Sequence, residues 1–133
     1  MIPIGERFTL KKEERLKSRK TIQQLFKEGK SFSIFPFRVI YIEEGDPEAN
    51  LKAAFSVSSK NFKKAVDRNR VKRLMREAYR LQKNNLKKAL TKTQKRLVIF
   101  FIYTGKELPD YQIVFEKMGT AIVRIEKIIE NDR

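Results

Sequence analysis

Residues Phe62 to Arg80 read FKKAVDRNRVKRLMREAYR, a run with the spacing of an amphipathic helix. When the run is placed on a wheel at ~100° per residue, its apolar side chains gather on one side. A stripe of this kind packs against other elements of a core. We therefore expect the helix to cover neighbouring strands within an α+β domain. The apolar positions are Val71, Leu74, Met75, Ala78 and Leu81.

The nearly opposite side of the same helix carries Arg68, Lys72, Arg76 and Arg80, spaced four residues apart. Like charges at this spacing destabilise a helix by ~0.2–0.5 kcal/mol per pair, and a purely solvated face more naturally alternates in sign. The row therefore predicts a partner that supplies negative charge. Arginine suits phosphate in particular, because its planar guanidinium can form two parallel hydrogen bonds.

The whole chain is strongly basic. Its 133 residues include 31 Lys and Arg against 16 Asp and Glu, a formal net charge of +15. Such an excess repels itself unless a polyanion binds and releases its counterions, so nucleic acid is the leading partner and an anionic membrane surface the second. The length and the 41% hydrophobic content suit one folded domain, residues 1–133, with a core of its own.

More basic residues surround the central row, so we expect a broad surface in contact with RNA. Three lysines lead into the start of the helix, where the helix dipole and unpaired backbone N–H groups also favour an anion. The residues predicted to contact RNA are Lys60, Lys63, Lys64, Arg68, Asn69, Arg70, Lys72, Arg73, Arg76 and Arg80.

The sequence contains no Cys and no His, which excludes disulfides, thiolate nucleophiles, imidazole bases and zinc sites of the usual kind. An acidic cluster at residues 43–47 is typical of a solvated hairpin loop rather than a metal site, because its ligands have no fixed geometry. We therefore expect no catalytic residue, no metal ligand, no small-molecule substrate and no cofactor bound by the protein alone.

Other partners fit the pattern less well. The longest apolar run, residues 97–103, is far too short to span a bilayer, and the start MIPIGERFTL lacks the pattern of a signal peptide, so we expect a cytoplasmic protein without membrane contact. A basic amphipathic helix could lie on a membrane or bind calmodulin, but this one has neither Trp nor Phe on its apolar side. A DNA-binding helix-turn-helix is also a poor fit, because the helix carries a row of Arg and only Asn69 near its start is of a type that reads bases.

Upstream of the basic helix the chain predicts an extended arm, a helix and two strands. Ser18 is placed to cap a helix that runs to about Glu28 and stops at Gly29. The aromatic and β-branched run at residues 32–42 predicts one strand, with Phe37, Val39 and Tyr41 on one face and Arg38, Ile40 and Ile42 on the other. Residues 52–58 predict a second strand. The arm covers residues 1–17.

Downstream, residues 84–96 read as a basic linker. The continuous apolar run at residues 97–103 predicts a strand buried on both faces. Asp110 can cap a final helix whose apolar stripe we assign to core packing alone. That stripe consists of Tyr111, Val114, Phe115, Met118, Ile122, Ile125 and Ile129.

The run at residues 62–80 resembles the signature of the bacterial ribonuclease P protein component, in which a basic pair leads through a short apolar step into R-N-R and a basic helix. Here that core is Arg68, Asn69 and Arg70. RLKSRKTIQQLFKEGKS resembles the opening helix of the family, and AAFSVSSKNFKKAV the strand before the signature. The similarity covers roughly residues 8–129. The family glycine before the signature is replaced, and Asn61 is the better substitute because Asn tolerates a positive φ.

The resemblance implies a ribozyme subunit. The partners would be the catalytic RNA, held through the Arg68 region, and precursor tRNA, whose 5′ leader the RNA cleaves with its own Mg²⁺. The leader would lie in a cleft between the opening helix and the sheet, where aromatic faces receive unstacked bases. The matching positions are Phe26 and Tyr41, with Ile22 and Phe37 beside them. Plain core packing is the alternative for Phe26 and Tyr41.

The resemblance also implies one sheet with helices packed on it, in the order α-β-β-(β)-α-β-α, and a left-handed crossover around the basic helix, against the usual right-handed preference. The chain would thus belong to an endoribonuclease holoenzyme of tRNA 5′ maturation without carrying the chemistry itself. The alternative is a ribosomal or other structural RNA-binding protein, which would not enhance leader removal.

Overall fold

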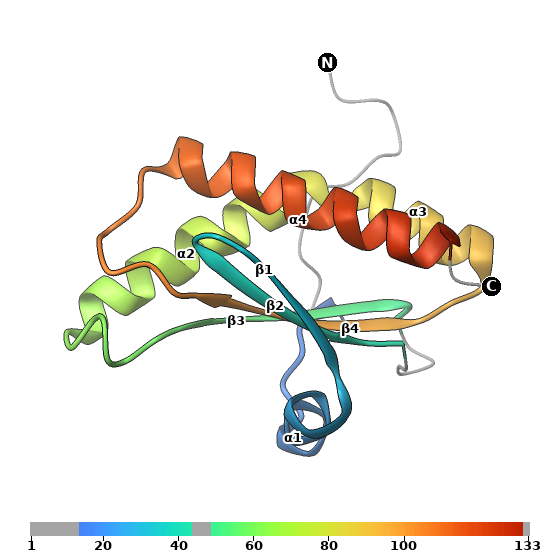
Figure 1. Cartoon of the computed structure of the whole chain (residues 1–133), viewed down its shortest axis with the longest axis horizontal. Coiled ribbons are helices and arrows are strands. Elements are labelled where there is room, and N and C mark those ends of the chain that lie inside the picture. Colours follow the sequence, from blue (N-terminus) through green and yellow to red (C-terminus); the bar gives the residue numbers. More distant parts are fainter. Residues whose placement is uncertain (1–13, 44–48, 132–133) are drawn as a thin grey trace.

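The computed structural model describes residues 14–43 and 49–131. Its sheet has the strand order β1-β2-β4-β3, with β4 antiparallel to β2 and parallel to β3 (Figure 1). The arrangement is the predicted α+β fold. The elements are α1 (Arg19–Glu28), β1 (Lys30–Ile34), β2 (Phe37–Ile42), β3 (Leu51–Val57), α2 (Ala65–Gln82), α3 (Asn84–Thr93), β4 (Leu97–Tyr103) and α4 (Tyr111–Asn131).

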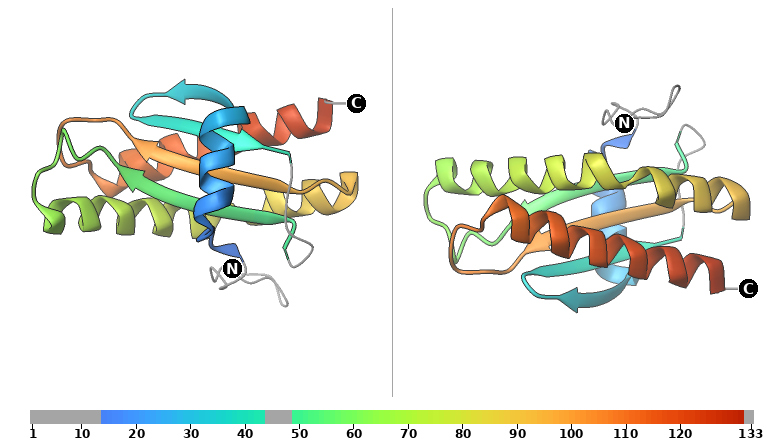
Figure 2. Two further views of the ribbon diagram at one scale, coloured as in Figure 1. Left: turned by 90° about the horizontal axis from the view of Figure 1, so that it is seen from below. Right: turned by 90° about the horizontal axis from the view of Figure 1, so that it is seen from above.

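The two faces of the sheet are covered differently. The helices α2, α3 and α4 cover one face, whereas α1 alone crosses the other (Figure 2). Phe37, Val39 and Tyr41 of β2 point into the larger core under the three helices, and Ile40 points into the smaller core under α1. The predicted alternation along this strand is therefore confirmed, and it determines which side chains can meet α1.

The strand β4 lies between β2 and β3 and is buried along nearly its whole length. This confirms the strand predicted from the continuous apolar run, since both of its faces contact apolar side chains. Between the parallel neighbours β3 and β4 the chain passes through α2 and α3 behind the sheet as seen from the α1 side, which makes the crossover left-handed (Figure 2). The helix α2 is thereby placed along one edge of the sheet.

The opening helix begins and ends where the sequence predicts. The Ser18 hydroxyl accepts a hydrogen bond of 3.3 Å from the Thr21 N–H, and the helix ends before Gly29. Gly29 is needed for close approach, because a Cβ there would lie 2.4 Å from the Leu25 carbonyl oxygen and 2.9 Å from Ile40 Cγ2. The chain can thus turn from α1 directly into the sheet.

Three local predictions are wrong. The run at residues 32–42 is two strands, because the chain reverses at Phe35–Pro36, a cis peptide, and pairs β1 with β2. The basic linker is largely the helix α3, which buries Leu86, Ala89 and Leu90 at helical spacing. Asn61 keeps a negative φ. Among the described residues other than glycine, Gln94 at the end of α3 is the one with a positive φ, 58°.

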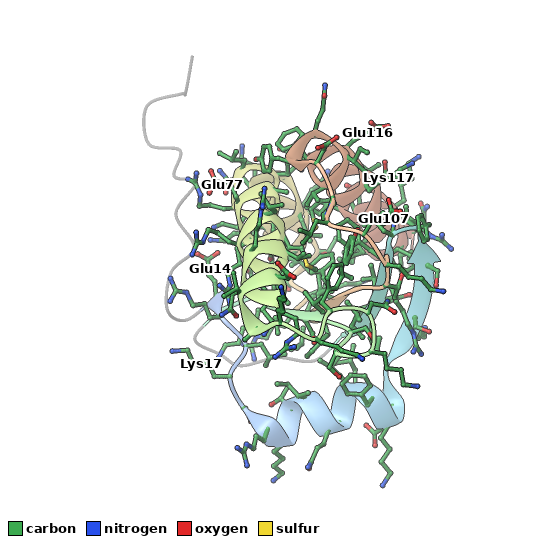
Figure 3. The ribbon with its side chains drawn as sticks, turned by 90° about the vertical axis from the view of Figure 1, so that its left-hand side faces the viewer. Glu14, Lys17, Glu77, Glu107, Glu116 and Lys117 are labelled. Atoms are coloured by element: carbon green, nitrogen blue, oxygen red, sulfur yellow. The ribbon has the colours of Figure 1, made fainter. Side chains whose placement is uncertain are left out.

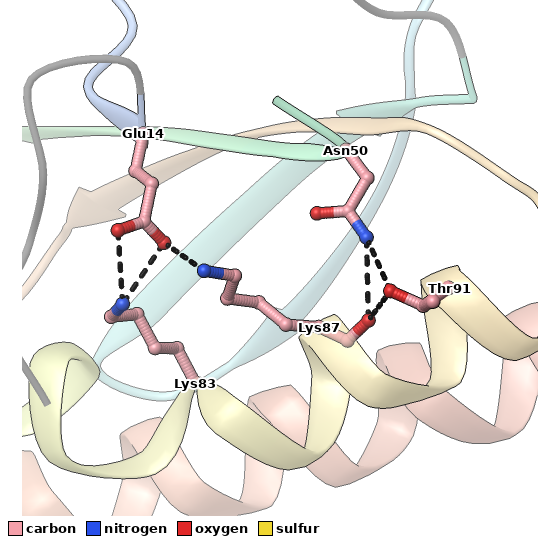
Figure 4. Close-up of polar contacts among 5 residues, drawn as sticks. All are labelled: Glu14, Asn50, Lys83, Lys87 and Thr91. Carbon is pink, nitrogen blue, oxygen red and sulfur yellow. Dashed lines mark hydrogen bonds and ion pairs between the residues drawn. The ribbon is translucent and has the colours of Figure 1, made fainter. Parts of the chain in front are cut away.

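A buried ion pair ties the segment before α1 to the junction of α2 and α3 (Figure 4). Lys83 Nζ lies 2.9 Å and 3.1 Å from the two carboxylate oxygens of Glu14, and Lys87 Nζ lies 3.0 Å from one of them. The Leu16 N–H then donates 2.9 Å to the Ala53 carbonyl of β3. The chain that enters α1 is therefore fixed on both sides.

Candidate nucleic-acid interface

The basic residues of α2 lie along one flank of the molecule, as the helical wheel predicts. Side chains of that flank stand beside Glu77, Glu14 and Lys17 in Figure 3, whereas Glu107, Glu116 and Lys117 mark the α4 side. Of the ten predicted positions, seven are exposed and three are half-buried. The exposed ones are Lys60, Lys63, Lys64, Asn69, Arg70, Arg73 and Arg76, and the half-buried ones are Arg68, Lys72 and Arg80.

Arg68 braces the loop that leads into α2. Its Nη1 donates to the carbonyl oxygens of Phe62 and Lys63, at 2.7 Å and 2.8 Å. Phe62 itself is buried against Tyr103, with ring centroids 6.0 Å apart. The first arginine of the R-N-R core therefore has a structural role in addition to its charge, because it holds the loop that carries the lysines.

At the other end of the row, Arg80 pairs with Glu77 on the same helix. The hydrogen bond from Arg80 lowers the pKa of the Glu77 carboxyl, and the same bond raises the pKa of Arg80. Glu77 therefore remains ionised and offsets part of the positive charge at this end of the helix. Arg76, which precedes Glu77 in the sequence, is exposed in the middle of the row.

On the α1 side, Phe26 is 55% exposed and forms a T-shaped pair with Phe100, with ring centroids 5.4 Å apart. Ile22 is half-buried against the smaller core. The core-packing alternative therefore does not describe Phe26, whose ring is open to solvent over an apolar strand. An exposed ring of this kind can receive a base by stacking.

Two of the four predicted leader positions are elsewhere. Phe37 is completely buried and Tyr41 is 7% exposed, and both belong to the core on the opposite face of the sheet. Tyr41 packs against Phe32, with centroids 6.1 Å apart. The prediction that they share a site with Phe26 is wrong, because alternation along β2 turns them away from α1. For Tyr41 the core-packing alternative is the correct one.

A hollow of about 370 Å³ lies beside the basic flank, and sequence reasoning missed most of its residues. It lies where the segment before α1 meets β3 and α2, and it adds the exposed Arg15 and Lys17 to the basic flank. The alternating polar and apolar residues of that segment were a weak signal for strand-like pairing. The lining residues are Arg15, Leu16, Lys17, Ala53, Ala54, Phe55 and Arg76.

Within residues 14–43 and 49–131, carboxylates do not gather in any group of three or more that could hold a metal ion. In the same ranges, none of the helices has the length and apolar character needed to cross a bilayer. The acidic turn predicted at residues 43–47 lies, except for Glu43, outside the described residues. The surface defined by these side chains is thus basic along α2 and aromatic beside α1.

Comparison with known proteins agrees with this geometry. A family model described as Ribonuclease P matches residues 10–126. The ribonuclease P protein component of Porphyromonas gingivalis is 43% identical over 119 residues, covering 89% of this chain and 87% of that protein. The RNase P protein of Thermotoga maritima superposes with a TM-score of 0.63 at 29% identity, covering 84% and 96% of the two chains. That of Staphylococcus aureus, at 22% identity, shares the fold with a TM-score of 0.67 over 89% and 99%. The chain belongs to the ribonuclease P protein family.

Proposed function

We propose that this member of the family acts as an RNA-holding subunit with two surfaces. The α2 flank binds the catalytic RNA of ribonuclease P. The α1 side binds the 5′ leader of precursor tRNA through Phe26. Hydrolysis of the leader bond is carried by the RNA with its own Mg²⁺, and the protein supplies binding and orientation.

The observation that carries this proposal is the continuity of the two surfaces. Arg76 of the basic row lines the same hollow as Arg15 and Lys17, and these two precede α1, the helix that carries Phe26. Positive charge tracks an RNA backbone, while an exposed aromatic ring stacks a base without sequence preference. The described residues that line this hollow include no Asp or Glu, so a single strand that leaves a structured RNA can pass along it from the α2 flank toward the α1 side.

The division of labour between protein and RNA rests on the side chains available. The sequence has no His and no Cys, and no trio of carboxylates converges among the described residues. The described part of the basic surface therefore offers single carboxylates such as Glu77 but no imidazole, no thiolate and no clustered set of metal ligands. This supports a protein that positions its partners.

Reconstitution tests the proposal. The purified protein is combined with the ribonuclease P RNA of Porphyromonas gingivalis, and removal of the leader from precursor tRNA is followed at low and high Mg²⁺. We expect faster cleavage with protein than with RNA alone, and no cleavage by RNA-free protein. A protein that binds the RNA but leaves the rate unchanged would be a structural RNA-binding protein, and the proposal would be rejected.

A further inference from the structure

The turn between β1 and β2 carries an aromatic ring where turns normally carry polar or small residues. Phe35 is 75% exposed. In the described part of the chain, it and Phe26 are the two aromatic side chains that are more than half exposed. The exposed ring of Phe35 contributes little burial to either core, so its chemistry is available for a partner.

The turn is braced from below. The Pro36 carbonyl oxygen accepts from both the Thr104 N–H, at 2.8 Å, and the Thr104 hydroxyl, at 3.1 Å. The Asn61 side chain donates to the carbonyls of Thr104 and Gly105, at 3.1 Å and 3.2 Å. Three loops are therefore held together at one end of the sheet, and Phe35 stands on a fixed support.

Those loops bring positive charge to the same end. Lys60, Lys63 and Lys64 lie in the loop before α2, and Lys106 follows Gly105. All four side chains are exposed. The exposed Glu107 and Asp110 in the loop before α4 offset part of this charge, so cations prevail by four to two. An exposed aromatic ring among lysines is a pattern typical of protein surfaces that bind single-stranded nucleic acid.

The surface between Phe26 and this turn is open. The side-chain row at Ile40 and Phe100 is buried under α1, whereas the next row along the same face, at Arg38 and Ile102, is exposed or half-exposed. Figure 2 shows α1 crossing the middle of the sheet and leaving the half toward the turn uncovered. The turn residue Pro36 lies four residues before Ile40, which at ~3.3 Å per residue is about 13 Å along the strand from the row of Ile40 and Phe100.

We propose that Phe35 is a second base-stacking position, which receives an unpaired RNA base at the end of the uncovered half of the sheet. This inference rests on the proposed function and extends it, because it assigns a second aromatic contact and a direction to the bound strand. The strand runs from Phe26 across Arg38 to the turn, where the lysine loops hold its phosphates. The base comes either from the substrate leader or from an unpaired part of the catalytic RNA.

The absence of Trp from the sequence provides a direct test. Phe35→Trp introduces a single indole, and its emission is followed during titration with a 12-nucleotide oligouridine. We expect quenching that saturates with binding, because an indole stacked on a base loses emission. The matched control is Val123→Trp, at a 47% exposed position on α4, which should bind the oligonucleotide equally well with unchanged emission.

Affinity gives the second readout. Phe35→Ala should weaken oligouridine binding by about 5- to 150-fold, the range expected for the loss of one stacked base. Phe35→Tyr should retain the wild-type affinity for oligouridine, whereas Phe35→Leu should lose it. The difference separates base stacking from simple apolar contact. The side chain is exposed, so these variants should unfold at the wild-type urea concentration.

Two arms identify the source of the base. If it belongs to the leader, Phe35→Ala weakens the complex of protein and catalytic RNA with precursor tRNA but not with mature tRNA. If it belongs to the catalytic RNA, the variant weakens assembly before substrate is added. Suppose that the wild-type protein binds oligouridine, that Phe35→Ala binds it equally well, and that the emission of Phe35→Trp is not quenched. This result overturns the present inference alone. If the wild-type protein binds no RNA at all, both this inference and the proposed function are overturned.

Discussion

Loss of either member of the buried pair Glu14 and Lys83 should lower the stability strongly, whereas loss of both together should change it little. Lys83 is 1% exposed, and its ammonium group contacts both carboxylate oxygens of Glu14. Removing one member of such a pair leaves a buried charge without compensation, at a cost of about 3–5 kcal/mol. Glu14 keeps a second partner in Lys87, at 3.0 Å, whose side chain is 32% exposed. We therefore expect Lys83→Met to lower the free energy of unfolding by about 3 kcal/mol, at the lower end of that range.

Removal of the other member of the pair, Glu14, should lower the free energy of unfolding by more. Glu14→Leu removes the Glu14 carboxylate from the buried Lys83, whereas the partly exposed Lys87 can reach water. The loss should therefore reach the upper end of the range, about 5 kcal/mol. In the double variant Glu14→Leu, Lys83→Met both charges are gone and the volumes are similar, so the stability should return to within about 1 kcal/mol of the wild type.

Urea unfolding followed by far-UV circular dichroism measures these differences, with Lys92→Met as a matched control on the exposed side of α3. That control should change the stability by no more than about 0.5 kcal/mol. The reasoning is refuted if Lys83→Met costs less than about 1 kcal/mol, or if the double variant is as unstable as the worse single one. The first result would mean that the pair is hydrated in solution, and the second would mean that the ion pair itself, and not a stranded charge, determines the stability.

Three further predictions concern RNA. Arg76→Ala should reduce the log–log salt slope of binding to the catalytic RNA by about 1, measured by filter binding between low and physiological salt, because one phosphate contact is lost; an unchanged slope would contradict the α2 flank. Glu77→Gln should raise that affinity at low salt, since it removes the negative charge that pairs with Arg80, and the gain should disappear at high salt. Phe26→Ala should cost ~1–3 kcal/mol in binding precursor tRNA and nothing for mature tRNA. Tyr41→Ala, by contrast, should lower the stability by several kcal/mol, in the ~3–5 kcal/mol range for a buried aromatic.

Periodic patterns predicted the elements that have one clear face. The final helix and the continuous apolar strand β4 formed as expected, because burial of an apolar face dominates their energetics. The stripe on α2 is right for Val71, Met75 and Ala78, but Leu81 is 36% exposed and Tyr79 is buried in its place. In α4 the interpretation of the stripe as core alone is only partly right. Val114, Met118, Ile122, Ile125 and Ile129 are buried, but Tyr111 and Phe115 at its start are 36% and 37% exposed.

The failures have a common physical origin in contacts between residues far apart in the chain. Alternation showed that Phe37 and Tyr41 share a face, but only the packing of α1 against Ile40 decides which face meets that helix. The lysines of α3 obscured its apolar stripe in the sequence, and Leu86, Ala89 and Leu90 are buried in a fold where α3 packs against α4. The hollow beside Arg15 likewise depends on the pairing of that residue with Ala53.

The structure also changes the argument from like charges on α2. From the sequence, the four cations of the row destabilise the helix together and all require an anionic partner. In the fold, Arg68 is stabilised by two carbonyl oxygens and Arg80 by Glu77, so the two ends of the row have partners within the protein. The demand for an external anion is therefore concentrated in the middle, at the half-buried Lys72 and the exposed Arg76, and Arg76 lines the hollow beside Arg15 and Lys17. A phosphate bound there would meet three cations from two segments of the chain, and this makes the middle of the row, more than the R-N-R core, the place where a single substitution should most reduce RNA affinity without disturbing the fold.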